Sequence, residues 1–160
     1  MPSHTTTRYS EKGVSVKAYC AEIERDVANQ QIATRTALRA AAEPVVAYPE
    51  SLDLLQRQGR PKEDLHKLGV LVQSIARDVD HFSAEERKLA EEFEDLKAKR
   101  PNHKGRLANH NARAVQVGMR YIDLNERILG TVNKTVEDLT EIIGGEIPAN
   151  QSAPDAEAQS

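Results

Sequence analysis

Residues 65–96 read LHKLGVLVQSIARDVDHFSAEERKLAEEFEDL, and the order of their apolar residues is the clearest structural signal in the chain. Apolar residues recur in it at alternating steps of three and four, the repeat of a helix that packs along one side against another helix. We call the positions that follow this repeat the seam. They are Leu65, Leu68, Val72, Ile75, Val79, Phe82, Leu89, Phe93 and Leu96, with Glu86 as the one polar member. The pattern predicts a long helix over residues 61–99, beginning at Pro61 with two acidic residues in its first turn.

Two features inside this helix leave alternatives open. Ser83 and Glu86 have the spacing of a capping box, so a kink or break at Phe82 is the alternative to one continuous helix. Glu86 also lies at a position that is normally apolar. It either pairs with a cation on the facing helix or marks a local opening of the seam, and we favour the opening.

A second long helix is predicted over residues 103–143, because Gly144 and Gly145 follow its last apolar residue. It is apolar on two faces and therefore needs two neighbours. The first face contains Val115, Ile122, Leu129, Val132, Val136, Leu139 and Ile143, and the second contains Ala114, Val117, Tyr121, Leu124 and Ile128. The connection from residue 99 to residue 103 is short, so the helices over 61–99 and 103–143 should fold back antiparallel as a hairpin. One face then packs on the seam, and an N-terminal helix or a second subunit must cover the second face.

The N-terminal helix is predicted over residues 15–43, ending before Pro44, whose ring disfavours a helical conformation at the preceding residue. Its apolar face is strong in its first half and becomes thin and polar afterwards. Residues 44–60 form a connector, in which Ser51 can cap one or two helical turns and Gly59 can end them.

The chain ends are polar, so we predict a flexible arm over residues 1–14 and a disordered acidic tail over residues 144–160. Between them, residues 15–143 form a single helical domain. Only 4% of residues are aromatic and Trp is absent, a composition that suits thin helix-on-helix contacts. The predicted fold class is all-α: an elongated, coiled-coil-like antiparallel helical hairpin with an additional N-terminal helix.

Positive charge gathers around the predicted hairpin turn. We call these residues the basic tip: Lys97, Lys99, Arg100, Lys104, Arg106, Arg113 and Arg120, with no acidic residue between Leu96 and Ile122. Such a patch can bind an acidic protein, a phosphate backbone or an anionic membrane surface. The interpretation that we favour is a solvated turn whose cations oppose the negative end of the preceding helix. Aromatic residues for stacking on bases are missing near it.

Recognisable catalytic or ligand-binding motifs are absent from the sequence. His66 and His81 are too far apart on one helix to share a metal ion, and His103 and His110 straddle a helix start. The single Cys20 lies in an apolar stripe, where a free cysteine behaves as a small hydrophobic residue. We therefore expect no enzyme activity, no cofactor and no metal. No signal peptide or membrane-spanning run is present in the sequence, and the lone cysteine favours a cytoplasmic location.

These observations predict a non-catalytic protein that binds other proteins, acting in assembly or as an adaptor, chaperone or structural component. In general architecture, a long helical hairpin with polar ends resembles small bacterial export chaperones and phage assembly proteins, although no motif carries functional residues over. We expect the partner to present a helical or acidic surface, and we expect a homo-oligomer, because a thin N-terminal helix would leave the second face (Val117, Tyr121, Leu124, Ile128) partly uncovered. The alternative is a nucleic-acid-associated protein that uses residues 97–120.

Overall fold

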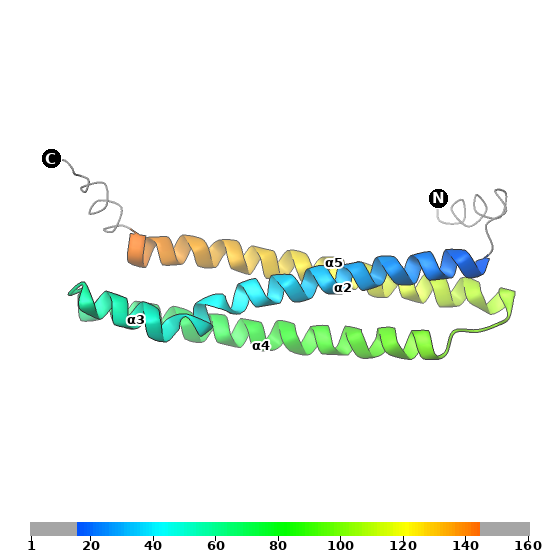
Figure 1. The fold of residues 1–160 in the computed structure, drawn as a ribbon, viewed down its shortest axis with the longest axis horizontal. Helices are drawn as coiled ribbons and strands as arrows, with labels where there is room; N and C mark the ends of the chain where they lie inside the picture. Colours follow the sequence, from blue (N-terminus) through cyan, green and yellow to red (C-terminus); the bar gives the residue numbers. More distant parts are fainter. Residues whose placement is uncertain (1–15, 145–160) are drawn as a thin grey trace. The chain divides into compact units, whose positions relative to one another are not determined.

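The computed structural model describes residues 16–144 (Figure 1). They form helices α2 (Val16–Val46), α3 (Tyr48–Arg57), α4 (Lys62–Ala98) and α5 (Lys104–Leu139), followed by a π-helical turn, η1 (Thr140–Gly144), and contain no strand. The predicted all-α class is confirmed. The arm predicted over 1–14, and all but the first residue of the tail predicted over 144–160, lie outside the described residues. Among residues 16–144, no helix combines the length and the apolar character needed to cross a membrane.

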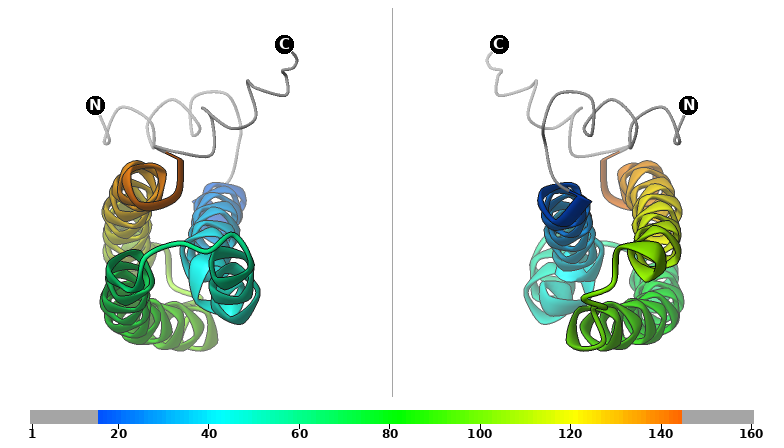
Figure 2. Two further views of the ribbon diagram at one scale, coloured as in Figure 1. Left: turned by 90° about the vertical axis from the view of Figure 1, so that its left-hand side faces the viewer. Right: turned by 90° about the vertical axis from the view of Figure 1, so that its right-hand side faces the viewer.

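The chain divides into two compact units, which we describe separately. Among the described residues, unit 1 contains 16–37 and 82–127, and unit 2 contains 38–81 and 128–144. Each unit is built from segments distant in sequence, and Figure 2 gives two further views of the helices.

Unit 1 contains three helical segments, from α2, α4 and α5. Ion pairs from Arg120 to Glu92 and from Arg127 to Glu85 join α5 to α4 in antiparallel order, as the predicted hairpin requires. Glu24 of α2 contacts His110 of α5, and the later Thr34 contacts the later Tyr121, so α2 runs parallel to α5. Because α5 is antiparallel to α4, α2 is antiparallel to α4 as well. The interior of this unit consists of Cys20, Ile23, Val27, Thr34, Ala37, Glu86, Leu89, Phe93, Leu107, His110, Asn111, Ala114, Val117, Tyr121 and Leu124, all buried.

Unit 2 is organised around Leu55, Leu68 and Val72. Val45, Tyr48, Leu65, Leu139, Ile142 and Ile143 pack against these three residues. Arg60 joins the start of α4 to η1 in this unit. Its guanidinium donates to the Ile142 carbonyl at 2.7 Å and pairs with Asp64 at 2.9 Å. The carbonyls of η1, which have no partner within a regular α-helix end, are thereby satisfied.

The seam lies inward along α4. Leu68, Val72, Ile75, Leu89 and Phe93 are buried, and Leu65, Val79, Phe82 and Leu96 are partly buried. Helix α4 continues without interruption through Phe82 and Ser83, so the alternative of a break there is wrong. A serine inside a helix keeps helical geometry when the flanking positions are packed, which here outweighs its preference for a cap.

The predicted end of the N-terminal helix at residue 43 is wrong. Helix α2 continues through Pro44 to Val46, and the Ala47 N–H donates to the Glu43 carbonyl at 2.9 Å. A proline inside a helix removes one hydrogen bond at a cost of about 3 kcal/mol, which packing can offset. The residues just beyond it, Val45 and Tyr48, pack against the core of unit 2.

The predicted connector over 44–60 is largely helical, because α3 begins at Tyr48, before Ser51. Its end follows the prediction: Gly59 has a φ of 70°, the left-handed conformation that favours glycine. The Arg60 N–H donates to the Leu55 carbonyl and the Gly59 N–H to the Gln56 carbonyl, both at 3.0 Å, which is the Schellman pattern of a helix end.

Candidate functional site

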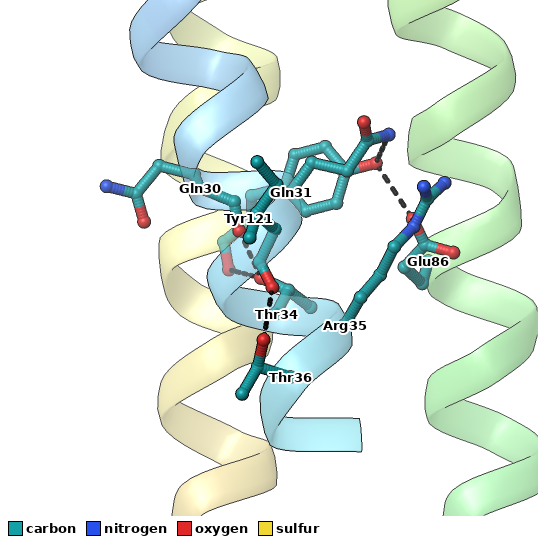
Figure 3. Close-up of polar contacts among 8 residues, drawn as sticks. Gln30, Gln31, Thr34, Arg35, Thr36, Glu86 and Tyr121 are labelled. Carbon is teal, nitrogen blue, oxygen red and sulfur yellow. Dashed lines mark hydrogen bonds and ion pairs between the residues drawn. The ribbon is translucent and has the colours of Figure 1, made fainter. Parts of the chain in front are cut away.

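A buried polar centre lies inside unit 1 (Figure 3). The Glu86 carboxylate, on α4, accepts a hydrogen bond from Arg35 of α2 at 2.9 Å and one from the Tyr121 hydroxyl of α5 at 3.2 Å. The same hydroxyl accepts from the Gln31 amide at 2.9 Å. The Thr34 hydroxyl, fully buried, donates to the Gln30 carbonyl at 2.8 Å. One carboxylate therefore links all three helical segments of the unit.

Glu86 does not open the seam, contrary to the interpretation that we favoured. Its side chain is 9% exposed, and Arg35 is the cation on the facing helix that the other interpretation required. The sequence signal for this pair was weak, since Arg35 precedes Glu86 by 51 residues. A buried polar group with one matching partner fixes the register in which helices pack.

Burial raises the pKa of Tyr121 to about 12, and the neighbouring Glu86 carboxylate adds to this rise. Both causes disfavour the charged phenolate. Tyr121 therefore keeps its proton and remains a hydrogen-bond donor to Glu86.

The basic tip is largely neutralised by neighbouring acids. Four of its seven cations form ion pairs: Lys97 with Glu94, Lys99 with Asp95, Arg100 with Glu24, and Arg120 with Glu92. Lys104, Arg106 and Arg113 are exposed and form no ion pair with another described residue. Lys97 also lies 4.6 Å from the centre of the Phe93 ring. Within the basic tip, the cations without an acidic partner among the described residues are thus these three, in the first turns of α5.

A second polar cluster joins α2 to α5, and we call it the Cys20 cluster: Cys20, Glu24 and His110. Their ligand atoms all lie within 4.8 Å of one another. The Cys20 thiol donates to Glu24 Oε2 at 3.6 Å, and His110 Nε2 lies 3.4 Å from the same oxygen. Arg100 donates to both Glu24 oxygens, with Nε at 2.9 Å from Oε2. Cys20 and His110 are buried, so the group faces the interior of unit 1.

The charges of this cluster are set by its contacts. Burial raises the pKa of the Cys20 thiol, and the nearby Glu24 carboxylate raises it further. Burial also acts to raise the pKa of Glu24, but hydrogen bonds from Arg100 and His110 outweigh it and hold that pKa below its ordinary value. The cluster therefore contains a neutral thiol beside an ionised carboxylate.

Of the two apolar faces of α5, the second is buried more completely than we expected, and the first is exposed at Val115, Ile122, Leu129 and Val136. The second face, which we expected a thin α2 to leave partly uncovered, is buried to 2% exposure or less at Val117, Tyr121, Leu124 and Ile128. Gly118 permits the close approach of α2, because a Cβ on it would lie 3.2 Å from Val27 Cγ2. In the thin half of α2, the small side chains of Thr34 and Ala37 are buried, which the apolar pattern alone did not indicate.

Instead, an apolar stripe of α5 faces outward within unit 1. We call it the outer stripe: Ala108, Ala112, Val115, Met119 and Ile122, all exposed and spaced by alternating steps of four and three. Val115, Met119 and Ile122 are 41%, 63% and 42% exposed. This spacing places all five on one side of the helix. It is the repeat of a helix–helix contact, left without a neighbour among the described residues.

A groove of about 470 Å³ runs beside the outer stripe, between α2 and α5. Val115, Gly118, Met119 and Ile122 form its α5 side, and Tyr19, Glu22, Ile23, Asp26, Val27, Asn29 and Gln30 form its α2 side. Its two charged residues, Glu22 and Asp26, are both acidic. A surface of this kind accepts apolar side chains and repels polyanions.

Unit 2 has a groove of larger volume, about 840 Å³, between α4 and the end of α5. Its charged residues are of mixed sign, and several are already paired, as Asp64 is with Arg60 and Lys134 with Asp138. Its apolar lining is limited to Val70, Leu71 and Ile142. This groove is therefore the weaker candidate for a binding surface.

Comparison with known proteins adds no assignment: the chain matched no protein-family model, no curated protein and no solved structure.

Proposed function

We propose that this protein is a non-catalytic assembly protein that acts by helix–helix docking, with the outer stripe of α5 as its contact surface. The observation that carries the proposal is the exposure of Val115, Met119 and Ile122 on one side of a regular helix. Apolar side chains at this repeat bury their surface most effectively against another helix. Association would remove them from water, at roughly 25 cal/mol for each Å² covered.

The partner that this surface fits best is a second copy of the chain. Lys104 lies eleven residues before Val115 and Glu126 eleven residues after it, and both are exposed. In an antiparallel contact of two α5 helices centred on Val115, each Lys104 faces Glu126 of the other copy. Opposite charges at both ends of such a contact favour this register over others.

Side-chain sizes are consistent with the same arrangement. Centring on Val115 places Ala108 opposite Ile122 of the other copy, and Ala112 within one position of Met119. Small residues opposite large ones allow two helices to approach closely and interdigitate. The outer stripe therefore matches itself in both charge and volume when it is turned by a two-fold axis.

The alternative function, association with nucleic acid through the basic tip, has less support. Four of the seven cations are already paired with carboxylates, and paired cations contribute less to counterion release from a phosphate backbone. The acidic rim formed by Glu22 and Asp26 would also oppose a polyanion at the neighbouring groove.

Replacing Met119 by Glu is expected to dissociate the proposed dimer. The substitution places a charge in the contact twice, once from each copy, and a buried unpaired charge weakens association by about 100-fold or more. Sedimentation velocity or light scattering over a range of concentrations measures this change. Gln116→Glu is the matched control, because it introduces the same charge at an exposed position outside the outer stripe. A monomeric wild type, or equal weakening in both variants, would contradict the proposal.

The antiparallel register predicts the result of a charge-exchange experiment. Lys104→Glu alone and Glu126→Lys alone should each weaken self-association, because each places like charges at both ends of the contact. An equimolar mixture of these two variants should form heterodimers in which both ends are again complementary. Native mass spectrometry distinguishes the two chains by mass. If the mixture contains no excess of heterodimer over a statistical distribution, the register is wrong.

A further inference from the structure

The Cys20 cluster brings together a thiol, an imidazole and a carboxylate from two helices of unit 1. Cys20 and Glu24 are one turn apart on α2, and His110 approaches them from the first turns of α5. We propose that Cys20 Sγ, Glu24 Oε2 and His110 Nε2 form a binding site for a zinc ion. This inference is independent of the outer stripe and of self-association.

The distances between the ligand atoms suit a tetrahedral ion. Bonds of about 2.0 to 2.3 Å from zinc to nitrogen, oxygen and sulfur place neighbouring ligand atoms about 3.3 to 3.8 Å apart. Glu24 Oε2 lies 3.6 Å from Cys20 Sγ and 3.4 Å from His110 Nε2, so two edges of the tetrahedron already have the required length. The third pair lies within 4.8 Å, a separation that side-chain rotation can shorten.

The chemistry of the three ligands selects the class of metal. A mixed set of sulfur, nitrogen and oxygen suits zinc and excludes magnesium and calcium, which bind to oxygen ligands. Three protein ligands leave a fourth coordination position for water or another small ligand. Cys20 loses its proton on binding, and His110 carries its remaining proton on Nδ1.

Glu24 is already oriented for this role. Arg100 donates to both oxygens of its carboxylate, and such outer contacts fix the direction of a metal ligand. A carboxylate offers about four lone-pair positions, so Oε2 can bind the ion through one lone pair and still accept from Arg100 Nε, while Oε1 remains with Arg100 Nη2. The ion takes the place of the thiol hydrogen that Oε2 accepts in the metal-free cluster. The bound ion would then join α2 to α5 directly.

Titration of the full-length protein with zinc chloride, in competition with a chromophoric chelator, tests the site. We expect one zinc ion per chain, and a loss of affinity of about 100-fold or more in Cys20→Ser and in His110→Gln. His103→Gln is the matched control, because His103 is an exposed histidine of the same hairpin turn. It should bind zinc as the wild type does.

Cobalt(II) provides a second readout that needs no variant. A thiolate ligand gives cobalt a charge-transfer band in the near ultraviolet, and tetrahedral coordination gives strong visible bands. We expect both in the wild-type protein. A cobalt complex without the thiolate band would overturn the proposal, as would zinc affinity that is unchanged in Cys20→Ser and His110→Gln or that depends on His103.

Discussion

Replacing Leu68 by Asp is expected to unfold unit 2. Leu68 is 1% exposed and forms the core of this unit with Leu55 and Val72. Loss of a buried leucine side chain costs about 2 to 5 kcal/mol, and burial of an unpaired carboxylate adds to that cost. The sum approaches the whole stability of a typical domain of about 5 to 15 kcal/mol. Hydrogen exchange of the amides in 38–81 and 128–144, together with circular dichroism, measures the loss.

Val70→Asp is the control for this substitution. Val70 lies two positions further along α4, is also apolar, and is 52% exposed. Both variants place an aspartate near the N-terminal end of the same helix, so the effect of the new residue on the helix itself is similar in the two. Only Leu68→Asp places the charge in the core. Equal stability of the two variants would show that the seam does not hold unit 2 together.

Regular patterns in the sequence predicted the parts of the fold that depend on a single helix. The three-and-four repeat from Leu65 to Leu96 identified both α4 and the face that it buries. Gly59 likewise identified a helix end, because its left-handed conformation is a local requirement. In both cases the physical cause lies within a few turns of one chain segment.

The predictions that failed depended on contacts between segments. Pro44 was expected to end a helix, yet packing of the following residues in unit 2 outweighs the local cost. On α5, we expected the N-terminal helix to cover the second face only in part, yet Val117, Tyr121 and Leu124 are buried. At Gly118 the absence of a side chain allows α2 to approach.

The candidate sites were predicted only in part. The basic tip was identified from charge alone. Two of its ion pairs are local, Lys97 with Glu94 and Lys99 with Asp95, whereas the pairs of Arg100 and Arg120 join it to distant acids. The Cys20 cluster could not be found by spacing, because His110 is 86 residues from Glu24. An α2 that runs parallel to α5 is what brings them together, and no short motif encodes that direction.

Tyr121 is the residue of unit 1 whose loss should cost most. It is fully buried and is the largest of the fully buried side chains. Replacement by Ala should lower the free energy of unfolding by about 3 to 5 kcal/mol, the range for a large aromatic residue in a core. Replacement by Phe keeps the ring and removes only the hydroxyl, whose hydrogen bond to a charged partner contributes about 1.5 to 3 kcal/mol. Denaturant unfolding of both variants separates the contribution of volume from that of the hydroxyl.

The stability of the wild type and that of Tyr121→Phe should depend differently on pH. Tyr121 has a pKa of about 12 in the folded chain, and an unfolded tyrosine has one of about 10. Between these values the unfolded state binds fewer protons than the folded state, so stability falls as pH rises. The contribution is complete below pH 10 and is lost as pH approaches 12. Other groups titrate in the same window, and the quantity to measure is therefore the difference between wild type and Tyr121→Phe. If that difference does not change from pH 9 to pH 12, the pKa of Tyr121 is not raised in the folded state. The Tyr121 hydroxyl is then not buried and hydrogen-bonded to Glu86 in solution.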